Sequence, residues 1–260
     1  MILGIDIGNT NITFGVFKND VIDTSFRIMT NSYLTSDEIG VRVKTILTSK
    51  GYDIEDIEDI IISSVVPSIM NGVIDGCKYY LNKEPIVLSN DIDYGIGLKT
   101  DYPNEIGIDR IVDMVAAKYY YSIPAIVIDF GTANTYDIID NNSDYIAGLT
   151  TPGIRTSLYG LVNKAAKLTN IELSKPKSIM AKNTKDSMNA GIIYGQVGQA
   201  KYIIDEFKST TGLDLNIVIT GGLGELIKDY FIDVSIYDKD LTLKGLMVIY
   251  KRLKNENWKC

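Results

Sequence analysis

The sequence predicts an α/β protein made of two similar halves, each a mixed β-sheet with helices packed against it. Two short segments carry this prediction, Asp6-Ile7-Gly8 and Asp129-Phe130-Gly131, because each follows an apolar run and precedes a returning strand. Asp129 lies 123 residues after Asp6, and Gly131 lies 123 residues after Gly8. A constant offset of this kind indicates two related halves facing one another, although a duplication without a ligand would leave the same pattern.

In the first half, three strands are followed by helix–strand units, which is typical of a mixed sheet covered by helices. Thr35-Ser36-Asp37-Glu38 has the residues of a helix start, and Gly51 follows the expected end of that helix. The dense apolar run before Pro67 predicts a strand covered on both faces. The expected elements are strands over 1–5, 12–17 and 21–29, a helix that starts within 35–38 and runs to about 49, a strand over 57–66, a helix over 68–81 and a strand over 85–88.

The second half partly repeats this order after a loop at 91–104 and a helix at 106–121. The expected elements are strands ending at 129, over 135–139 and over 145–147, a helix over 153–167, a connector over 168–183, a helix over 186–210, a strand over 216–220 and a helix over 241–253. Three glycines on the longest helix predict either a close approach of another element or a weaker helix. We place the domains at 1–119 and 120–260.

Composition excludes several classes of function. The net charge of −7 disfavours nucleic acid as the main partner, because phosphate contacts need clustered Lys and Arg. The chain has no histidine, which excludes Ser-His-Asp chemistry and His-ligated zinc and leaves a carboxylate, Lys, Tyr or Cys as general base. No apolar run is long enough to span a membrane, and no secretory signal is recognisable, so we expect a cytoplasmic protein. Cys77 and Cys260 fit no metal spacing and are expected to be free thiols.

The first turn has the residues expected of a site for a metal-bound polyphosphate. Asp6 ends a strand where it could hold a hydrated cation, and Gly8 lets backbone approach a bound group. Asn9 tolerates a turn conformation, and Thr10 adds a short donor. An ordinary hairpin with an Asx turn is the alternative.

Two further segments carry candidate chemistry. Gly221-Gly222 follows a buried type of strand and could lie flat against a nucleobase or ribose, although most glycines in such places only form a turn. In Gly107-Ile108-Asp109-Arg110, Asp109 could accept a proton from a hydroxyl, and Arg110 could hold a carboxylate or phosphate. The alternative is a helix start with an acidic first turn and a surface ion pair.

Taken in order, the motifs of this chain resemble the type III pantothenate kinase family, within the sugar-kinase, actin and heat-shock-chaperone ATPase superfamily. The resemblance runs nearly end to end. It is carried by Asp6-Ile7-Gly8-Asn9-Thr10-Asn11, Ile62-Ser63-Ser64-Val65-Val66-Pro67, Gly107-Ile108-Asp109-Arg110, Asp129-Phe130-Gly131-Thr132-Ala133, Pro152-Gly153-Ile154, Lys182-Asn183-Thr184, Thr220-Gly221-Gly222-Leu223 and Asp240-Leu241-Thr242-Leu243-Lys244-Gly245-Leu246.

The resemblance implies two ribonuclease-H-like domains with the active site in the cleft between them, and transfer of the ATP γ-phosphate to pantothenate. Magnesium would be held near Asp6, Asp109 would accept the proton, and Asp129 would hold potassium or ammonium. It also implies a homodimer. The residues implied in ATP binding are Asp6, Ile7, Gly8, Asn9, Thr10, Asn11, Ile12, Thr13, Thr132, Gly221 and Gly222, and those implied in pantothenate binding are Gly107, Ile108, Asp109, Arg110 and Thr184.

The chain departs from the family pattern mainly on the acceptor side. Ile108 stands where the family usually has alanine, Thr100 where a tyrosine is frequent, and Asn134 where threonine is common. These departures keep two alternatives open. One is a kinase of the same superfamily with another small hydroxylated acceptor, and the other is a non-enzymatic member such as an accessory factor for transcription.

Overall fold

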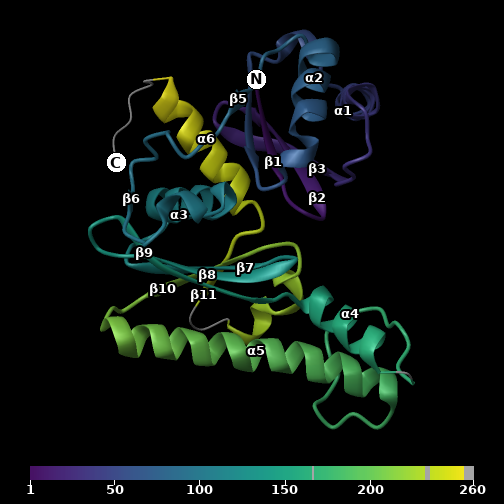
Figure 1. Ribbon diagram of the computed structural model, residues 1–260, viewed down its shortest axis with the longest axis vertical. Helices are drawn as coiled ribbons and strands as arrows, with labels where there is room; N and C mark the ends of the chain where they lie inside the picture. The colour runs from purple at the N-terminus through teal and green to yellow at the C-terminus, as the bar shows by residue number, and fades with distance from the viewer. Residues whose placement is uncertain (166, 232–234, 255–260) are drawn as a thin grey trace. The chain divides into compact units, whose positions relative to one another are not determined.

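Each Asp-x-Gly segment ends the first strand of a three-stranded antiparallel meander in the computed structural model, which describes residues 1–165, 167–231 and 235–254 (Figure 1). β1 and β7 begin and end 123 residues apart, and so do β3 and β9. β1 and β7 also share the same order of buried and half-buried residues. The bounds are β1 Ile2–Ile7, β2 Asn11–Lys18, β3 Val21–Met29, β7 Ala125–Phe130, β8 Ala133–Ile139 and β9 Asp144–Pro152.

The chain divides into two compact units, which are described separately. Unit 1 consists of Met1–Gly95, Tyr102–Tyr119 and the chain from Leu241 onward, and unit 2 of Ile96–Asp101 and Tyr120–Asp240. The closing helix thus groups with unit 1, whereas the expected second domain, 120–260, included it. The domain boundary after residue 119 and the location of the active site stay predictions.

Unit 1 is a five-stranded mixed sheet in the order β3-β2-β1-β4-β5, with β4 at Asp59–Ser64 and β5 at Ile86–Val87. Helices α1 (Ser36–Ser49) and α2 (Met70–Leu81) bury their apolar faces against one side of it. Thr35 and Glu38 form the expected capping box at the start of α1. A Cβ on Gly76 of α2 would lie 3.0 Å from the Ser36 carbonyl oxygen, so a small residue there allows α1 and α2 to pack closely.

The other face of this sheet contacts the closing helix, α6 (Leu241–Leu253). Gly4 and Gly15 are paired across β1 and β2, and Cβ atoms on them would lie 3.5 Å from Leu246 and 3.0 Å from Leu243. This pair of glycines leaves room for the leucines of α6. Gly245 faces helix α3 (Ile108–Tyr120), where a Cβ would lie only 2.3 Å from the Val112 carbonyl oxygen. The C-terminal motif of the sequence is therefore a packing motif.

Unit 2 repeats the same sheet order as β9-β8-β7-β10-β11, with a short strand β6 added beside β9. The added elements are β6 Gly97–Leu98, β10 Asn216–Thr220 and β11 Ser235–Tyr237. Helices α4 (Ile154–Lys164) and α5 (Thr184–Thr211) pack into a hydrophobic core with β7, β8 and β10, and Figure 1 shows α5 running along the sheet. Short 3₁₀ helices lie at Ile54–Asp56, Pro67–Ile69, Pro103–Glu105, Gly224–Leu226 and Lys228–Tyr230.

Several expectations are refined. β6 lies in a segment expected to be a loop, β11 was not expected, and α4 ends three residues earlier than predicted. Cβ atoms on Gly191, Gly195 and Gly198 would meet open space among the described residues, so no close approach explains them. Cys77 is a buried free thiol, whereas Cys260 lies outside the described residues. No described helix is both long and apolar enough to cross a membrane.

Candidate active site

In unit 1, Asp6 is placed at the end of β1 and is held from the neighbouring parallel strand. The Ser63 hydroxyl donates a hydrogen bond of 2.6 Å to its carboxylate, and Ser63 itself is fully buried. Burial raises the pKa of Asp6 to about 7; the Ser63 bond opposes this rise, and the nearby Asp109 carboxylate adds to it. The structure thus brings two predicted site residues, Asp6 and Asp109, close together.

The turn after Asp6 presents backbone rather than large side chains. The Gly8 amide donates to the Asn11 carbonyl at 3.0 Å, and the Thr30 hydroxyl donates to the Gly8 carbonyl at 2.7 Å. Asn9 and Thr10 are exposed at its tip. Among the other predicted ATP-binding residues here, Gly8, Asn11 and Thr13 are half-buried, and Ile7 and Ile12 are fully buried in the core. The two isoleucines therefore offer a ligand only their backbone.

The Gly107–Arg110 corner starts helix α3. The Gly107 carbonyl accepts hydrogen bonds from the amides of Arg110 and Ile111, and the Asp109 carboxylate accepts one from the Arg110 amide at 2.8 Å. A Cβ on Gly107 would lie 2.5 Å from that carboxylate, so a side chain at this position would displace the Asp109 carboxylate. Asp109 and Arg110 are half-buried, whereas Ile108 is 9% exposed. This corner thus presents a carboxylate and a guanidinium, with Ile108 mostly buried beside them.

In unit 2, the predicted cation residue Asp129 lies beside the predicted Gly221-Gly222 turn. Gly221 has a φ of +91°, and a Cβ on it would lie 2.1 Å from the Asp129 carboxylate and 2.6 Å from the Phe130 amide nitrogen. The Leu223 amide donates to the Phe130 carbonyl at 3.2 Å, which joins the two turns. Glycine is required here both for its positive φ and for the close approach.

The turn that carries Thr132 is held by the first turn of α4. The Thr156 hydroxyl donates to the Thr132 carbonyl at 2.6 Å. A Cβ on Gly153, the residue before α4, would lie 2.4 Å from both the Gly131 and the Thr132 carbonyl oxygens. The Pro152-Gly153 motif therefore fits the helix start directly against the Asp129–Thr132 turn.

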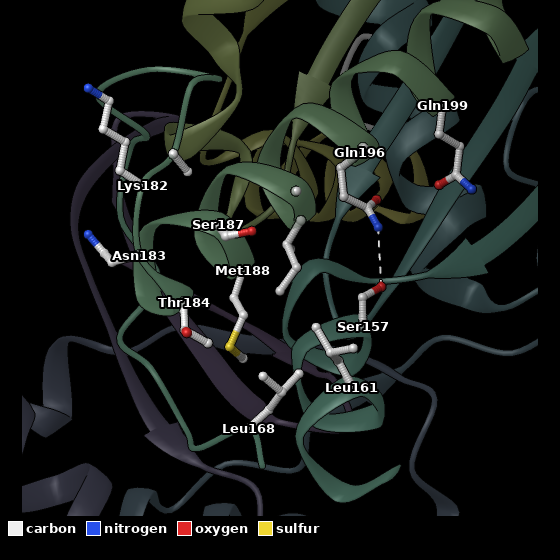
Figure 2. Close-up of a pocket in the computed structure, with 14 residues that line it drawn as sticks. Ser157, Leu161, Leu168, Lys182, Asn183, Thr184, Ser187, Met188, Gln196 and Gln199 are labelled. Carbon is white, nitrogen blue, oxygen red and sulfur yellow. Dashed lines mark hydrogen bonds between the residues drawn. The ribbon is translucent and has the colours of Figure 1, made fainter. Parts of the chain in front are cut away.

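Thr184, the remaining predicted substrate residue, lines a pocket of about 890 Å³ between α4, the connector and α5. Figure 2 shows its labelled side chains, with Lys182, Asn183 and Thr184 at the start of α5 and Gln196 and Gln199 further along it. The Asn183 side chain caps α5 by accepting from the Asp186 amide at 2.9 Å. The pocket belongs wholly to unit 2.

Sequence reasoning missed two polar side chains that the structure places beside these turns. Ser63 was named within an expected strand and within a family motif but was given no role, although a polar residue in a buried strand was a usable signal. Gln196 lies inside the longest helix and is 8% exposed, and it hydrogen-bonds to Asn134 at the start of β8. Gln196 and Asn134 are 62 residues apart in the sequence, and no local sequence pattern predicts their hydrogen bond.

The donor atoms fit the cations that a kinase needs. Magnesium prefers hard oxygen ligands and is usually bound through one or two carboxylates together with phosphates and waters. Asp6 supplies one such carboxylate at the end of β1 in unit 1. In the described ranges no group of three or more Asp, Glu, Cys or His side chains gathers in one place, so phosphate and water oxygens would complete the shell. In unit 2, the Asp129 carboxylate lies beside Gly131 and Gly221.

Comparisons with known proteins show the family to which the chain belongs. The model of the type III pantothenate kinase family matches residues 2–206. A type III pantothenate kinase from Agathobacter rectalis is 49% identical over 253 residues, which is 97% of each chain. A Campylobacter jejuni structure, described as a conserved protein of the Baf transcriptional-activator family, is 26% identical with a TM-score of 0.60 and covers 97% of this chain and 99% of that chain.

The fold extends to more distant proteins. MreB 5 of Spiroplasma citri, solved with AMPPNP, has a TM-score of 0.55 at 12% identity and covers 98% of this chain and 97% of that chain. At this identity the likeness concerns the fold alone, and it confirms the predicted α/β fold, with mixed sheets flanked by helices. With the family match and the close relative, these findings identify the protein: the chain belongs to the type III pantothenate kinase family.

Proposed function

We propose that this chain transfers the γ-phosphate of ATP to the primary hydroxyl of pantothenate, giving 4′-phosphopantothenate in the first step of coenzyme A biosynthesis. The observation that carries the proposal is the proximity of Asp6 and Asp109 in unit 1 of a chain from this family. Phosphoryl transfer needs mainly positioning and charge neutralisation, with one base for the hydroxyl. One carboxylate can serve the metal-bound phosphates and the other the acceptor.

Each residue of unit 1 then has a distinct part. The kinase family implies ATP with Mg²⁺, which supplies positive charge against the phosphates when bound. Asp6 would hold it, with the Gly8–Asn11 backbone around the phosphates. Asp109 would accept the hydroxyl proton, because a chain without histidine needs a carboxylate for this task. Arg110 would orient the substrate carboxylate.

Unit 2 carries the other residues that we propose for nucleotide and cation binding. Thr132 and the Gly221-Gly222 turn would contact ATP. Asp129 would hold potassium or ammonium, because Gly131 and Gly221 have no side chains that could cover its carboxylate. Replacing K⁺ by Na⁺ in the assay should lower turnover in the wild type. Asp129→Asn should remove this dependence on the cation, whereas an unchanged K⁺ response would assign the cation elsewhere.

The direct test is turnover by the purified chain with ATP, MgCl₂, KCl and a panel of hydroxylated acids, with products identified by mass spectrometry. Phosphorylated pantothenate is the expected product. Turnover only with a different acceptor would replace pantothenate and would make Ile108 and Thr100 the first residues to mutate. ATP that is never consumed with any acceptor would exclude a kinase.

We further propose a cytoplasmic homodimer whose contact includes the α4–α5 side of unit 2. Leu161 lines the pocket and is 40% exposed. Ile179 and Met180 directly precede Ala181, another residue that lines the pocket, and they are 70% and 76% exposed. Exposed apolar groups at one pocket rim support an interface. Thr184, in the same pocket, would then contact pantothenate. Met180→Glu should shift sedimentation velocity from dimer to monomer, and an unchanged dimer would move the interface away from this rim.

A non-enzymatic part in transcription is the second candidate, because the Campylobacter jejuni relative is described in those terms. The net charge of −7 argues against direct contact with DNA phosphates. ATP binding without any turnover would favour this candidate over the kinase.

A further inference from the structure

Gln196 is a buried polar side chain in the middle of α5, and it reaches two different strands of unit 2. Its Oε1 accepts a hydrogen bond from the Asn134 side-chain amide, at the start of β8. Its Nε2 lies 3.3 Å from both the Pro152 carbonyl oxygen, at the end of β9, and the Ser157 hydroxyl in α4 (Figure 2 shows the Ser157 bond). One amide therefore joins β8, β9 and α4 to the long helix.

These contacts converge on the turn that carries Thr132. Asn134 lies two residues after Thr132 and pairs with Phe130 across the turn. Pro152 precedes Gly153, whose Cα lies directly against the Gly131 and Thr132 carbonyls, and Thr156 donates to the Thr132 carbonyl. Any shift of β8 or of the α4 start must move this turn, because both of its flanks are held through Gln196.

The surroundings of Asn134 make the Gln196 contact costly to lose. Asn134 is 0% exposed, and its Oδ1, the Thr151 hydroxyl and the Tyr136 hydroxyl find no hydrogen-bond partner of ordinary geometry among the described residues. Asn134 and Thr151 are direct cross-strand neighbours, and Tyr136 follows on the same face. Without Gln196, the buried Nδ2 of Asn134 would lose its hydrogen-bond acceptor, which destabilises that local arrangement.

We propose that Gln196 is a positioning residue for nucleotide binding, which sets the Gly131–Thr132 turn through Asn134 on one side and Pro152 and Ser157 on the other. This inference rests on the proposed function in one respect, the contact of Thr132 with ATP. Gln196 itself touches no reacting atom. Its action is to keep two strand ends and one helix start in register with each other.

The test compares Gln196→Met, which keeps side-chain length and removes both hydrogen-bonding groups, with Glu206→Met as the control. Glu206 lies on the same helix, is exposed and lies outside the set of residues that line the pocket. The readouts are KM for ATP, KM for pantothenate, kcat, and the Kd of a non-hydrolysable ATP analogue with Mg²⁺ by calorimetry. For Gln196→Met we expect the KM for ATP and the analogue Kd to rise about 10-fold, with the KM for pantothenate within about two-fold. Glu206→Met should match the wild type.

A merely structural role would give a different result. It would lower kcat through loss of folded enzyme and leave both KM values and the analogue Kd unchanged, and that outcome would overturn the proposal. The double variant Asn134→Val with Gln196→Met replaces both partners by apolar groups and should recover thermal stability. ATP affinity should stay weak in it, because Pro152 and Ser157 are still not held; recovery of affinity together with stability would also overturn the proposal.

The outcome is separable from the proposed function. A wild type that does not phosphorylate pantothenate would refute the function, whereas the analogue Kd would still report on Gln196. A wild type that phosphorylates pantothenate, together with an unchanged Kd in Gln196→Met, would refute only the positioning role.

Discussion

The hydroxyl of Ser63 donates a 2.6 Å hydrogen bond to the carboxylate of Asp6 from the adjacent parallel strand. Ser63 is fully buried and Asp6 is half-buried, so solvent reaches this contact only from the Asp6 side. Burial raises the pKa of Asp6, and the Ser63 bond works against that rise because it favours the charged carboxylate. The pair therefore holds a carboxylate in an environment that disfavours its charge, and this costs stability until a cation binds.

Asp6→Asn should stabilise the protein without nucleotide or Mg²⁺. The folded pKa of Asp6, about 7, lies above its ordinary value of 3.8, so the folded state keeps a proton that the unfolded chain releases. The free energy of unfolding therefore falls as the pH rises from the ordinary pKa of 3.8 to the folded pKa of about 7. We expect the variant to gain about 1–3 kcal/mol at pH 8 and less than half of that at pH 5, measured by urea unfolding.

The same variant should lose Mg²⁺-dependent use of ATP. An Asp6→Asn protein that is no more stable than the wild type at pH 8 would contradict the raised pKa. An unchanged dependence on Mg²⁺–ATP would separately remove Asp6 from the phosphate site.

Ser63→Ala should weaken the protein most at high pH. Removal of the donor leaves the ionised Asp6 carboxylate with one hydrogen bond fewer, so we expect a loss of about 1–2 kcal/mol at pH 8 and a smaller loss at pH 5. Ser64→Ala is the matched control, since the Ser64 hydroxyl accepts a hydrogen bond from the Val66 amide and not from a titrating group. Equal pH dependence in the two variants would disprove the link to Asp6.

Asp109→Asn should lower kcat by about 100-fold or more, with ATP binding largely retained, because it removes the proposed proton acceptor and keeps side-chain size. Steady-state kinetics and calorimetry with an ATP analogue would measure both quantities. Glu105→Gln makes the same carboxylate-to-amide change at an exposed position four residues earlier and should leave kcat unchanged. Near-wild-type turnover in Asp109→Asn would assign the base elsewhere.

Two helical glycines should respond in opposite directions to the same substitution. Gly245→Ala places a Cβ about 2.3 Å from the Val112 carbonyl oxygen and should cost about 1–3 kcal/mol. Gly198→Ala meets open space on α5 and should gain up to about 1 kcal/mol from helix propensity. Urea unfolding of both variants checks the difference. A neutral Gly245→Ala would show that α3 and α6 separate at little cost.

Local sequence patterns determined most of the elements of this protein. The strands Val21–Met29 and Asn216–Thr220 and the helix Leu241–Leu253 have the expected bounds, because alternating or helical periodicity and clear turn residues surround them. The Asp-x-Gly repeat also predicted the two matching meanders. These signals lie within a few residues of one another, where the chain itself limits the possible conformations.

Only the tertiary structure decided which side chains meet. β6 and β11 are very short strands at the two edges of their sheet. Each is a strand because it pairs with one neighbouring strand, and its own sequence has no alternating pattern long enough to predict it. Ser63 reaches Asp6 across 57 residues and Gln196 reaches Asn134 across 62, so burial and packing bring these pairs together. A hydrogen bond between distant segments depends on the angle and register of whole elements, and no short stretch of sequence specifies either.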